Sequence, residues 1–203
     1  MPVEEHRQAL HLLAVVGSVT PPGRLRRAVE EAVERVRPSV AAAELIDLGE
    51  RRISLADGRE PDSFGDDTGV VVEAVQSADV VVFATPTYRG SMTGALKNVF
   101  DLLPVPALQA KVVALVAMGG SDHHFLGADR HLRDVLSFFG ALVVPVSVYV
   151  TGADFVDGAP AERATQALDE LFAGAVNLAA AVGGDEVGEL GPVSLWANAL
   201  ARR

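Results

Sequence analysis

Three arginines crowd the start of the first predicted helix. Arg24, Arg26 and Arg27 follow Gly17–Gly23, a segment that contains two prolines and two glycines. The unpaired N–H groups and the dipole of a helix N-terminus attract anions, so positive side chains are unfavourable there unless an anion is bound. The pattern therefore indicates a phosphate site. An alternative explanation, that Arg26 and Arg27 pair with glutamates one turn later, does not extend to Arg24.

A second candidate segment combines an aromatic residue with a glycine between a predicted strand and a predicted helix. Its residues are Thr85, Pro86, Thr87, Tyr88, Arg89, Gly90 and Ser91. The combination suits a flat heteroaromatic ligand, because an aromatic ring offers a stacking surface or an edge and a glycine lets the backbone approach closely. The alternative is purely structural, with Tyr88 covering the sheet and Thr93 capping the next helix. Both interpretations remain open at this point.

Other chemistries find little support in the residue types. The chain contains no cysteine, so it has no thiol nucleophile or thiolate metal site, and redox chemistry requires a bound cofactor. His123 and His124 are adjacent and point in different directions on a helix, which disfavours a metal site, and His131 is expected to be solvated. The motifs of P-loop ATPases, Rossmann-type dehydrogenases and nucleophile-elbow hydrolases are absent, which disfavours those functions.

Length and composition fit one globular domain. The 203 residues are 49% apolar, ample for one packed core, and the formal net charge is −10. A nucleic-acid or anionic-membrane binder needs a clustered basic face, so neither partner is expected. Every apolar run is too short to cross a bilayer, and the first residues lack the order of a signal peptide, so we expect a cytoplasmic protein.

Apolar runs typical of buried strands alternate with amphipathic helical patterns along the chain. The predicted strands are Leu10–Val16, Glu44–Leu48, Asp79–Ala84, Lys111–Met118 and Ala141–Val150. The predicted helices cover 25–36, 70–76, 93–103, 122–139 with Asp122 as the cap, and 160–182, while Gly49–Gly69 is a long loop with little structure of its own. This order predicts one α/β domain over residues 1–182 with a parallel sheet. Residues 183–203 form a tail in which Trp196 is a candidate for packing on a partner subunit.

The expected sheet also places the candidate site. In an open parallel sheet, ligands bind beyond the carboxyl ends of the strands, where the strand order reverses. Three segments leave such ends here: Gly17–Leu25, Thr85–Ser91 and Gly119–His124. We therefore expect all three to converge on one crevice.

The residues in and after the second segment resemble a known enzyme family. Pro86-Thr87-Tyr88 and Gly94-Ala95-Leu96-Lys97-Asn98 are similar to the linked motifs of the NADPH-dependent FMN reductases, and Asp101–Pro104 and Gly119–Ser121 continue the likeness. The similarity covers most of Leu10–Val182 and is greatest to the reductases of alkanesulfonate-type two-component monooxygenases. It implies a flavodoxin-like, doubly wound, five-stranded parallel sheet with helices on both faces.

The resemblance also implies which residues bind FMN. The phosphate falls on Ser18, Gly23, Arg24 and Leu25, the isoalloxazine ring on Pro86, Thr87, Tyr88, Arg89 and Gly90, and the opposite wall on Gly119, Gly120 and Ser121. This chain has prolines where the family has several small hydroxyls, so phosphate binding is expected to rest on backbone N–H groups, Ser18 and Arg24. His123 or His124 is expected to line the flavin pocket or the nicotinamide entrance, and no interface role is assigned to Arg130.

The implied activity is hydride transfer from NADPH or NADH to FMN, with reduced flavin then released to a partner monooxygenase. A homodimer or homotetramer is implied as well. No side chain is expected to act as a catalytic acid or base, because the cofactors carry the chemistry. Backbone N–H groups of residues 87–90 are expected to meet the ring oxygens, with Arg89 stabilising the reduced ring. Two alternatives share this fold: an FMN-containing reductase of quinones, azo dyes or metal oxyanions, and a non-catalytic electron carrier like flavodoxin.

Overall fold

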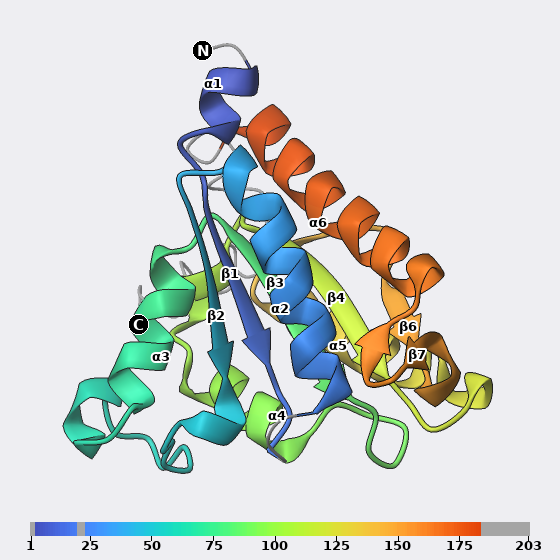
Figure 1. Ribbon diagram of the computed structural model, residues 1–203. Helices are drawn as coiled ribbons and strands as arrows, with labels where there is room; N and C mark the ends of the chain where they lie inside the picture. The colour runs from blue at the N-terminus through green and yellow to red at the C-terminus, as the bar shows by residue number, and fades with distance from the viewer. Residues whose placement is uncertain (1–2, 20–22, 184–203) are drawn as a thin grey trace.

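A parallel sheet forms the centre of the molecule, as Figure 1 shows for a computed structural model that describes residues 3–19 and 23–183. Its strands lie in the order β2, β1, β3, β4, with β5 and β6 sharing the edge beside β4, and every pairing is parallel. The strand bounds are β1 His11–Val16, β2 Ala42–Asp47, β3 Val80–Pro86, β4 Val112–Met118, β5 Leu142–Val143 and β6 Val148–Val150. This is the doubly wound order 2-1-3-4-5 of flavodoxin-like proteins, which confirms the predicted fold.

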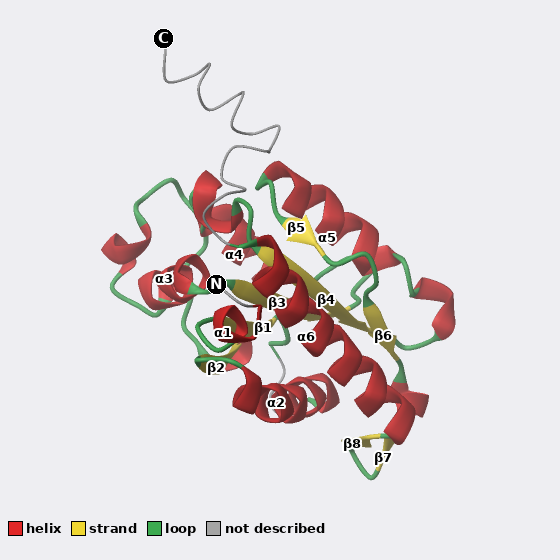
Figure 2. Ribbon diagram, turned by 90° about the horizontal axis from the view of Figure 1, so that it is seen from above, coloured by secondary structure: helices red, strands yellow, loops and turns green. Residues whose placement is uncertain are grey.

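Helices cover both faces of the sheet. Their bounds are α1 Val3–Arg7, α2 Arg24–Val36, α3 Thr68–Ser77, α4 Gly94–Leu102, α5 Gly127–Phe138 and α6 Glu162–Val182. Helices α2 and α6 lie on one face, while α3, α4 and α5 lie on the other (Figures 1 and 2). The strand order reverses at β1 and β3, where the crossovers change face, and the site is expected at this point.

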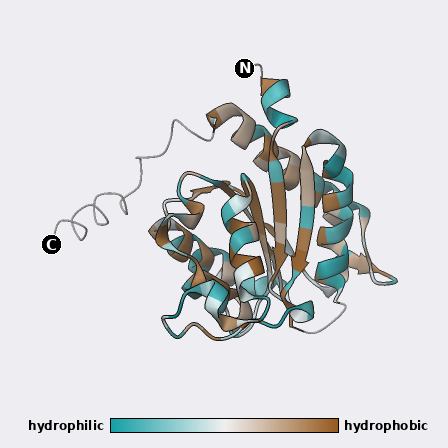
Figure 3. Ribbon diagram, turned by 90° about the vertical axis from the view of Figure 1, so that its left-hand side faces the viewer, coloured by the Kyte–Doolittle hydropathy of each residue, from teal (hydrophilic) through white to brown (hydrophobic). Residues whose placement is uncertain are grey.

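Each face of the sheet has its own hydrophobic core. Along β1, Leu12, Ala14 and Val16 pack with the apolar sides of α2 and α6, whereas Leu13 and Val15 pack with those of α3, α4 and α5. Figure 3 shows the resulting brown strands between helices whose outer sides are largely teal. Because both faces are covered, the central strands are continuous apolar runs, the pattern that identified them in the sequence.

The last strand is interrupted, although the sequence predicted one strand over Ala141–Val150. Val112 of β4 faces Leu142 of β5, whereas Val116 faces Val148 of β6, so the edge carries two more residues than β4 over this span. Pro145 lies in the break, and a proline cannot donate a ladder hydrogen bond. The prediction of one continuous strand is therefore wrong, because the proline interrupts the ladder inside an otherwise apolar run.

Arg133 of α5 fills the break in the edge strand. Its Nη2 donates to the carbonyl oxygens of Val144 and Pro145 at 3.0 and 3.1 Å, and its Nε bonds to both carboxylate oxygens of Asp129 at 3.0 and 3.1 Å. Carbonyl groups that lost their ladder partners are thereby satisfied by a side chain of the neighbouring helix. The same contacts fix α5 against the sheet.

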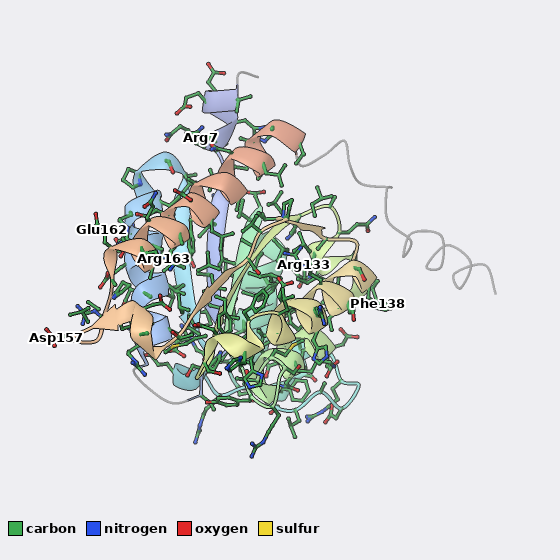
Figure 4. The ribbon with its side chains drawn as sticks, turned by 90° about the vertical axis from the view of Figure 1, so that its right-hand side faces the viewer. Arg7, Arg133, Phe138, Asp157, Glu162 and Arg163 are labelled. Atoms are coloured by element: carbon green, nitrogen blue, oxygen red, sulfur yellow. The ribbon has the colours of Figure 1, made fainter. Side chains whose placement is uncertain are left out.

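Three further expectations need correction. Asp122 does not cap the fifth helix: it begins a separate 3-10 turn, Asp122–His124, and α5 starts at Gly127 without a side-chain cap. The predicted loop Gly49–Gly69 contains a 3-10 turn, Pro61–Phe64, and joins α3 directly. A two-stranded hairpin, β7 Phe155–Val156 and β8 Ala159–Pro160, follows β6 and was not predicted, and its tip residue Asp157 is labelled in Figure 4. Short elements of this kind lack the length that gives a clear period.

Apart from Gly183, the predicted tail and its Trp196 lie outside the described residues. Within residues 3–19 and 23–183, none of the helices combines the length and apolar character needed to cross a membrane.

Candidate functional site

The described parts of the three predicted segments lie at the carboxyl edge of the sheet, at the lower end of the strands in Figure 1. The N–H of Gly17 donates to the carbonyl of Ala84 at 2.7 Å, and the N–H of Thr87 donates to that of Met118 at 2.7 Å. Backbone hydrogen bonds thus link the first segment to the end of β3 and the second to the end of β4. These bonds bring the ends of β1, β3 and β4 together at a single rim.

Thr93 joins the first two segments through buried hydrogen bonds. Its hydroxyl donates to the carbonyl of Gly17 at 2.6 Å and accepts from the N–H of Leu96 at 3.2 Å, while its own N–H donates to the hydroxyl of Thr85 at 3.1 Å. Thr93 therefore caps α4, as the structural alternative proposed. It also holds the first segment against the second, a role that the sequence alone did not reveal.

Arg26 and Arg27 are occupied by carboxylates, as the ion-pair explanation held. The Arg26 guanidinium lies 2.8 Å from Glu30 and 3.3 Å from the buried carboxylate of Asp47. Burial raises the pKa of Asp47, because removal from water disfavours the charged form. Arg27 pairs with Glu31 at 3.0 Å. These two arginines are engaged within the protein and are poor candidates for binding a ligand phosphate.

Arg24 differs from both because no carboxylate pairs with it in the described part of the chain. Its Nη1 donates weakly to the carbonyl of Gly152 at 3.4 Å, and its guanidinium lies 5.5 Å from the centre of the Phe155 ring. Helix α2 has no acidic residue in its first turn and no side-chain N-cap at Gly23. The helix start therefore keeps a positive charge that an anion would neutralise.

The second segment forms a tight turn with an exposed aromatic side chain. The N–H of Tyr88 donates to the carbonyl of Ser91 at 2.9 Å and the reverse bond is 3.1 Å, with Arg89 and Gly90 between them at φ +54° and +79°. The Tyr88 side chain is 49% exposed, so it does not cover the sheet and is accessible to a ligand. Both φ values are positive, as in the two-residue turns of hairpins.

Thr87 places a buried hydroxyl in this segment without a partner among the described residues. Buried polar atoms are nearly always hydrogen-bonded, so the exception suits a ligand that brings the missing partner. The N–H groups of Thr87 and Tyr88 are already engaged, which corrects the expectation that all four N–H groups of residues 87–90 face a ring. Among the described residues, those of Arg89 and Gly90 remain without an acceptor. A polar heteroaromatic ring edge, such as that of a flavin, fits this set of donors.

Tyr149 of β6 supports the third segment and was missed in the sequence. Its hydroxyl donates to the carbonyl of Ser121 at 2.7 Å, and a Cβ atom added to Gly119 would overlap the same hydroxyl at 1.7 Å. Burial raises the pKa of Tyr149, which keeps the phenol protonated as a donor. Only a glycine fits at position 119, so this glycine has a packing role. Gly120 and Ser121 follow it at the rim.

The remaining predicted residues occupy this edge in different ways. Ser18 is buried, and Pro86 is the last residue of β3. The Leu25 side chain is buried in the core, which leaves its backbone for any ligand contact. His123, His124 and Arg130 are exposed, and the described residues contain no group of three or more potential metal ligands.

Lys97 and Asn98 of the resemblance motif have partners inside the protein. Lys97 pairs with Asp101 at 2.5 Å. The Asn98 amide donates to the carbonyl of Ser54 at 2.9 Å and accepts from the N–H of Ala56 at 2.9 Å. Asn98 therefore fastens the loop after β2 to α4, whereas the Lys97 pair lies within α4 itself.

The fold and this rim define a flavodoxin-like α/β protein with a cationic helix start next to an aromatic turn. A family model described as NADPH-dependent FMN reductase matches residues 10–155, more than half of the chain. The chain therefore belongs to the NADPH-dependent FMN reductase family.

Two relatives show how far the likeness extends. An NAD(P)H-dependent FAD/FMN reductase of Geobacillus thermodenitrificans is 44% identical over 116 residues, which are 57% of this chain and 62% of that protein. The chain thus spans less than two thirds of that relative's length. The NADH-dependent FMN reductase SfnE of Pseudomonas putida is 33% identical over 149 residues, which are 73% of this chain and 80% of that protein.

A solved structure agrees with the fold. The crystal structure of the apo form of an NADH:FMN oxidoreductase (EMOB) superposes with a TM-score of 0.69 at 25% sequence identity. The match covers 88% of this chain and 92% of that one.

Proposed function

We propose that this chain binds FMN at the described rim and catalyses its reduction by NADPH or NADH. The observation that carries the proposal is the buried hydroxyl of Thr87, which has no partner among the described residues and lies on the turn that exposes Tyr88. Arg24, for which the same residues supply no carboxylate, lies at the start of α2 at the same edge of the sheet. This arrangement provides polar, aromatic and positively charged contacts for a ring bearing a phosphate. The names of both relatives include flavin reduction, which supports the same activity here.

The chain's own residues bind and orient the flavin. Ser18, Arg24 and the backbone N–H groups at Gly23 and Leu25 would hold the phosphate at the start of α2. The ring would lie between the turn Pro86–Gly90 and the wall Gly119–Ser121, with Thr87 and the free N–H groups bonding to its polar edge. When bound, FMN supplies the ring that accepts the hydride.

Binding the two nucleotides face to face is the main catalytic task, because orientation alone removes much of the barrier to a bimolecular transfer. Tyr88 lies at the mouth of the rim, where it limits how a nicotinamide approaches. Arg89, at the tip of the turn, adds positive charge where negative charge develops on the ring. No acid or base is needed at the reacting atoms.

The proposal extends to a partner enzyme, an oligomeric state and a cellular location. Reduced flavin would serve a partner monooxygenase, as the resemblance to two-component systems implies, and the chain would act as a homodimer or homotetramer. A cytoplasmic location suits a consumer of reduced nicotinamide nucleotides.

The test combines binding with reduction. FMN is titrated into the protein while quenching of flavin fluorescence is followed, and NADPH or NADH is then added without oxygen. We expect saturable quenching and rapid bleaching of the flavin absorption with at least one nucleotide. A protein that leaves FMN fluorescence unchanged at high concentration contradicts the proposal, and binding without bleaching would indicate an electron carrier.

Thr87→Val makes the test specific to the site. Valine matches the shape of threonine and removes a buried hydroxyl that has no partner in the described part of the chain, so the free protein should be at least as stable as the wild type. FMN affinity should fall by about tenfold, since a bond to the ring edge is lost.

Steady-state turnover of the wild-type protein distinguishes the remaining alternative. Turnover that ignores added FMN would favour a tightly held prosthetic group serving quinones, azo dyes or metal oxyanions.

A further inference from the structure

The start of α5 packs closely against the turn that carries Tyr88, Arg89 and Gly90. A Cβ atom added to Gly127, the first residue of α5, would lie 2.7 Å from the carbonyl oxygen of Gly90. Real Cβ atoms do not approach backbone oxygen so closely, so at this position the helix meets the turn backbone to backbone. Glycine at 127 is what permits this approach.

One helical turn further along, α5 contacts the same turn a second time. The Nδ1 atom of His131 lies 2.8 Å from the hydroxyl oxygen of Ser91, which is a hydrogen bond between residues 40 positions apart in sequence. Ser91 also closes the turn by its two backbone bonds with Tyr88. His131 is exposed on α5, as expected for a solvated position, and it also has a defined partner on the second segment of the rim.

Helix α5 is itself firmly placed. Leu132 and Leu136 are fully buried in the core between α5 and the sheet, and Arg133 ties the helix to the break in the edge strand. Arg133 and Phe138 mark the course of this helix in Figure 4. A helix fixed to the sheet on one side and to the turn on the other can transmit its position to the turn.

Residues 127 and 131 are four positions apart, so they lie on the same side of α5. We infer that Gly127 and His131 are positioning residues, which hold the turn 88–91 at the distance from the wall Gly119–Ser121 that a flavin ring requires. The inference rests on the proposed function and deepens it. Neither residue needs to touch the flavin, since His131 acts through Ser91 and Gly127 acts through Gly90.

The turn needs such support because little else holds it. Tyr88 and Arg89 are exposed, and among residues 3–19 and 23–183 the backbone bonds that close the turn are those between Tyr88 and Ser91. Without the His131 bond, the turn samples positions in which the Thr87 hydroxyl and the free N–H groups no longer match the ring edge. FMN affinity should therefore fall while the stability of the free protein barely changes, because one exposed hydrogen bond contributes little to folding.

The experiment measures FMN dissociation constants by fluorescence quenching for His131→Ala, Ser91→Ala and the double variant. Each single variant should bind FMN about three- to tenfold more weakly, and the double variant should be no worse than either, because all three remove the same bond. His131→Asn retains a polar atom close to the position of Nδ1 and should recover most of the affinity. Arg130→Ala, an exposed neighbour on the same helix, is the matched control and should bind FMN as the wild type does.

Gly127→Ala tests the second contact independently. The added methyl group must displace the carbonyl of Gly90, so this variant should lose more FMN affinity than His131→Ala while its far-UV circular dichroism stays unchanged. Wild-type protein that does not bind FMN would overturn the proposed function together with this inference. If the wild type binds FMN and the His131, Ser91 and Gly127 variants bind it equally well, only the positioning role is overturned.

Discussion

Arg24 and Arg27 lie on the same helix turn but differ in what neutralises them. Arg27 has Glu31 at 3.0 Å, whereas Arg24 contacts only a carbonyl and the face of Phe155 in the described part of the chain. A guanidinium near an aromatic face keeps its charge and its donors for an anionic partner such as a phosphate. The local charge balance thus singles out one arginine among three that look alike in the sequence.

Arg24→Met should weaken FMN binding by roughly tenfold to a hundredfold, because a charge-assisted bond to the phosphate is lost while the apolar stem remains. Titration of fluorescence quenching measures this change. Arg27→Met is the matched control, and we expect its affinity within about threefold of the wild type, since an exposed ion pair contributes little. Equal losses in the two variants would show that bulk charge, and not a placed Arg24, attracts the ligand.

Single residues were predictable where the signal was local. The crowding of arginines at a helix start and the Tyr88–Gly90 pair are visible within a few positions, and the structure places both at the rim. Tyr149 and His131 were missed because their partners, Ser121 and Ser91, lie 28 and 40 positions away. A hydrogen bond across that separation leaves no spacing in the sequence, so only the fold reveals it.

At the scale of elements, buried strands and amphipathic helices were predicted well and irregular connections poorly. The segment between β2 and α3 illustrates the reason. It has no periodicity, yet the carboxylate of Asp66 accepts from the hydroxyl of Ser54 at 2.7 Å and from the N–H of Thr68 at 2.9 Å. Polar contacts of individual side chains, which follow no period, hold this connection in place.

Asp66 should make the stability of the protein depend on pH in acid. Hydrogen bonds from Thr68 and Ser54 lower the pKa of Asp66 from 3.8 to about 2. The folded state therefore holds its proton less tightly than the unfolded state, so the stabilisation is complete above pH 3.8 and is lost as the pH falls towards 2. Asp66→Asn removes the titration.

Urea unfolding at a series of pH values checks this expectation. The difference in unfolding free energy between wild type and Asp66→Asn should be constant near neutral pH and should shrink below pH 3.8. Asp62→Asn, at an exposed aspartate of the same connection, serves as the control. A difference that stays constant down to pH 2 would mean that the carboxylate of Asp66 is not held by these bonds in solution.

At the scale of the whole molecule, several large apolar side chains remain exposed near α5. Phe125 precedes the helix, Phe138 ends it, and Val146 lies in the break of the edge strand beside it. Figure 4 shows Phe138 at the outer side of the molecule, away from the hairpin tip at Asp157. Exposed apolar groups gathered near one helix favour contact with another protein surface. We expect that surface to belong to a second copy of the chain.

Light scattering coupled to size exclusion should therefore give the mass of a homodimer or homotetramer. Phe138, which is 59% exposed, should be covered in that assembly, so Phe138→Glu should shift the mass towards the monomer because it buries an unpaired charge in the contact. Val3→Glu changes an apolar residue of similar exposure, 51%, on α1 and should leave the mass unchanged. A wild-type protein that stays monomeric at every concentration would contradict the oligomer. An unchanged mass for Phe138→Glu would place the contact on another face, because a carboxylate without a partner is not tolerated inside a close-packed interface.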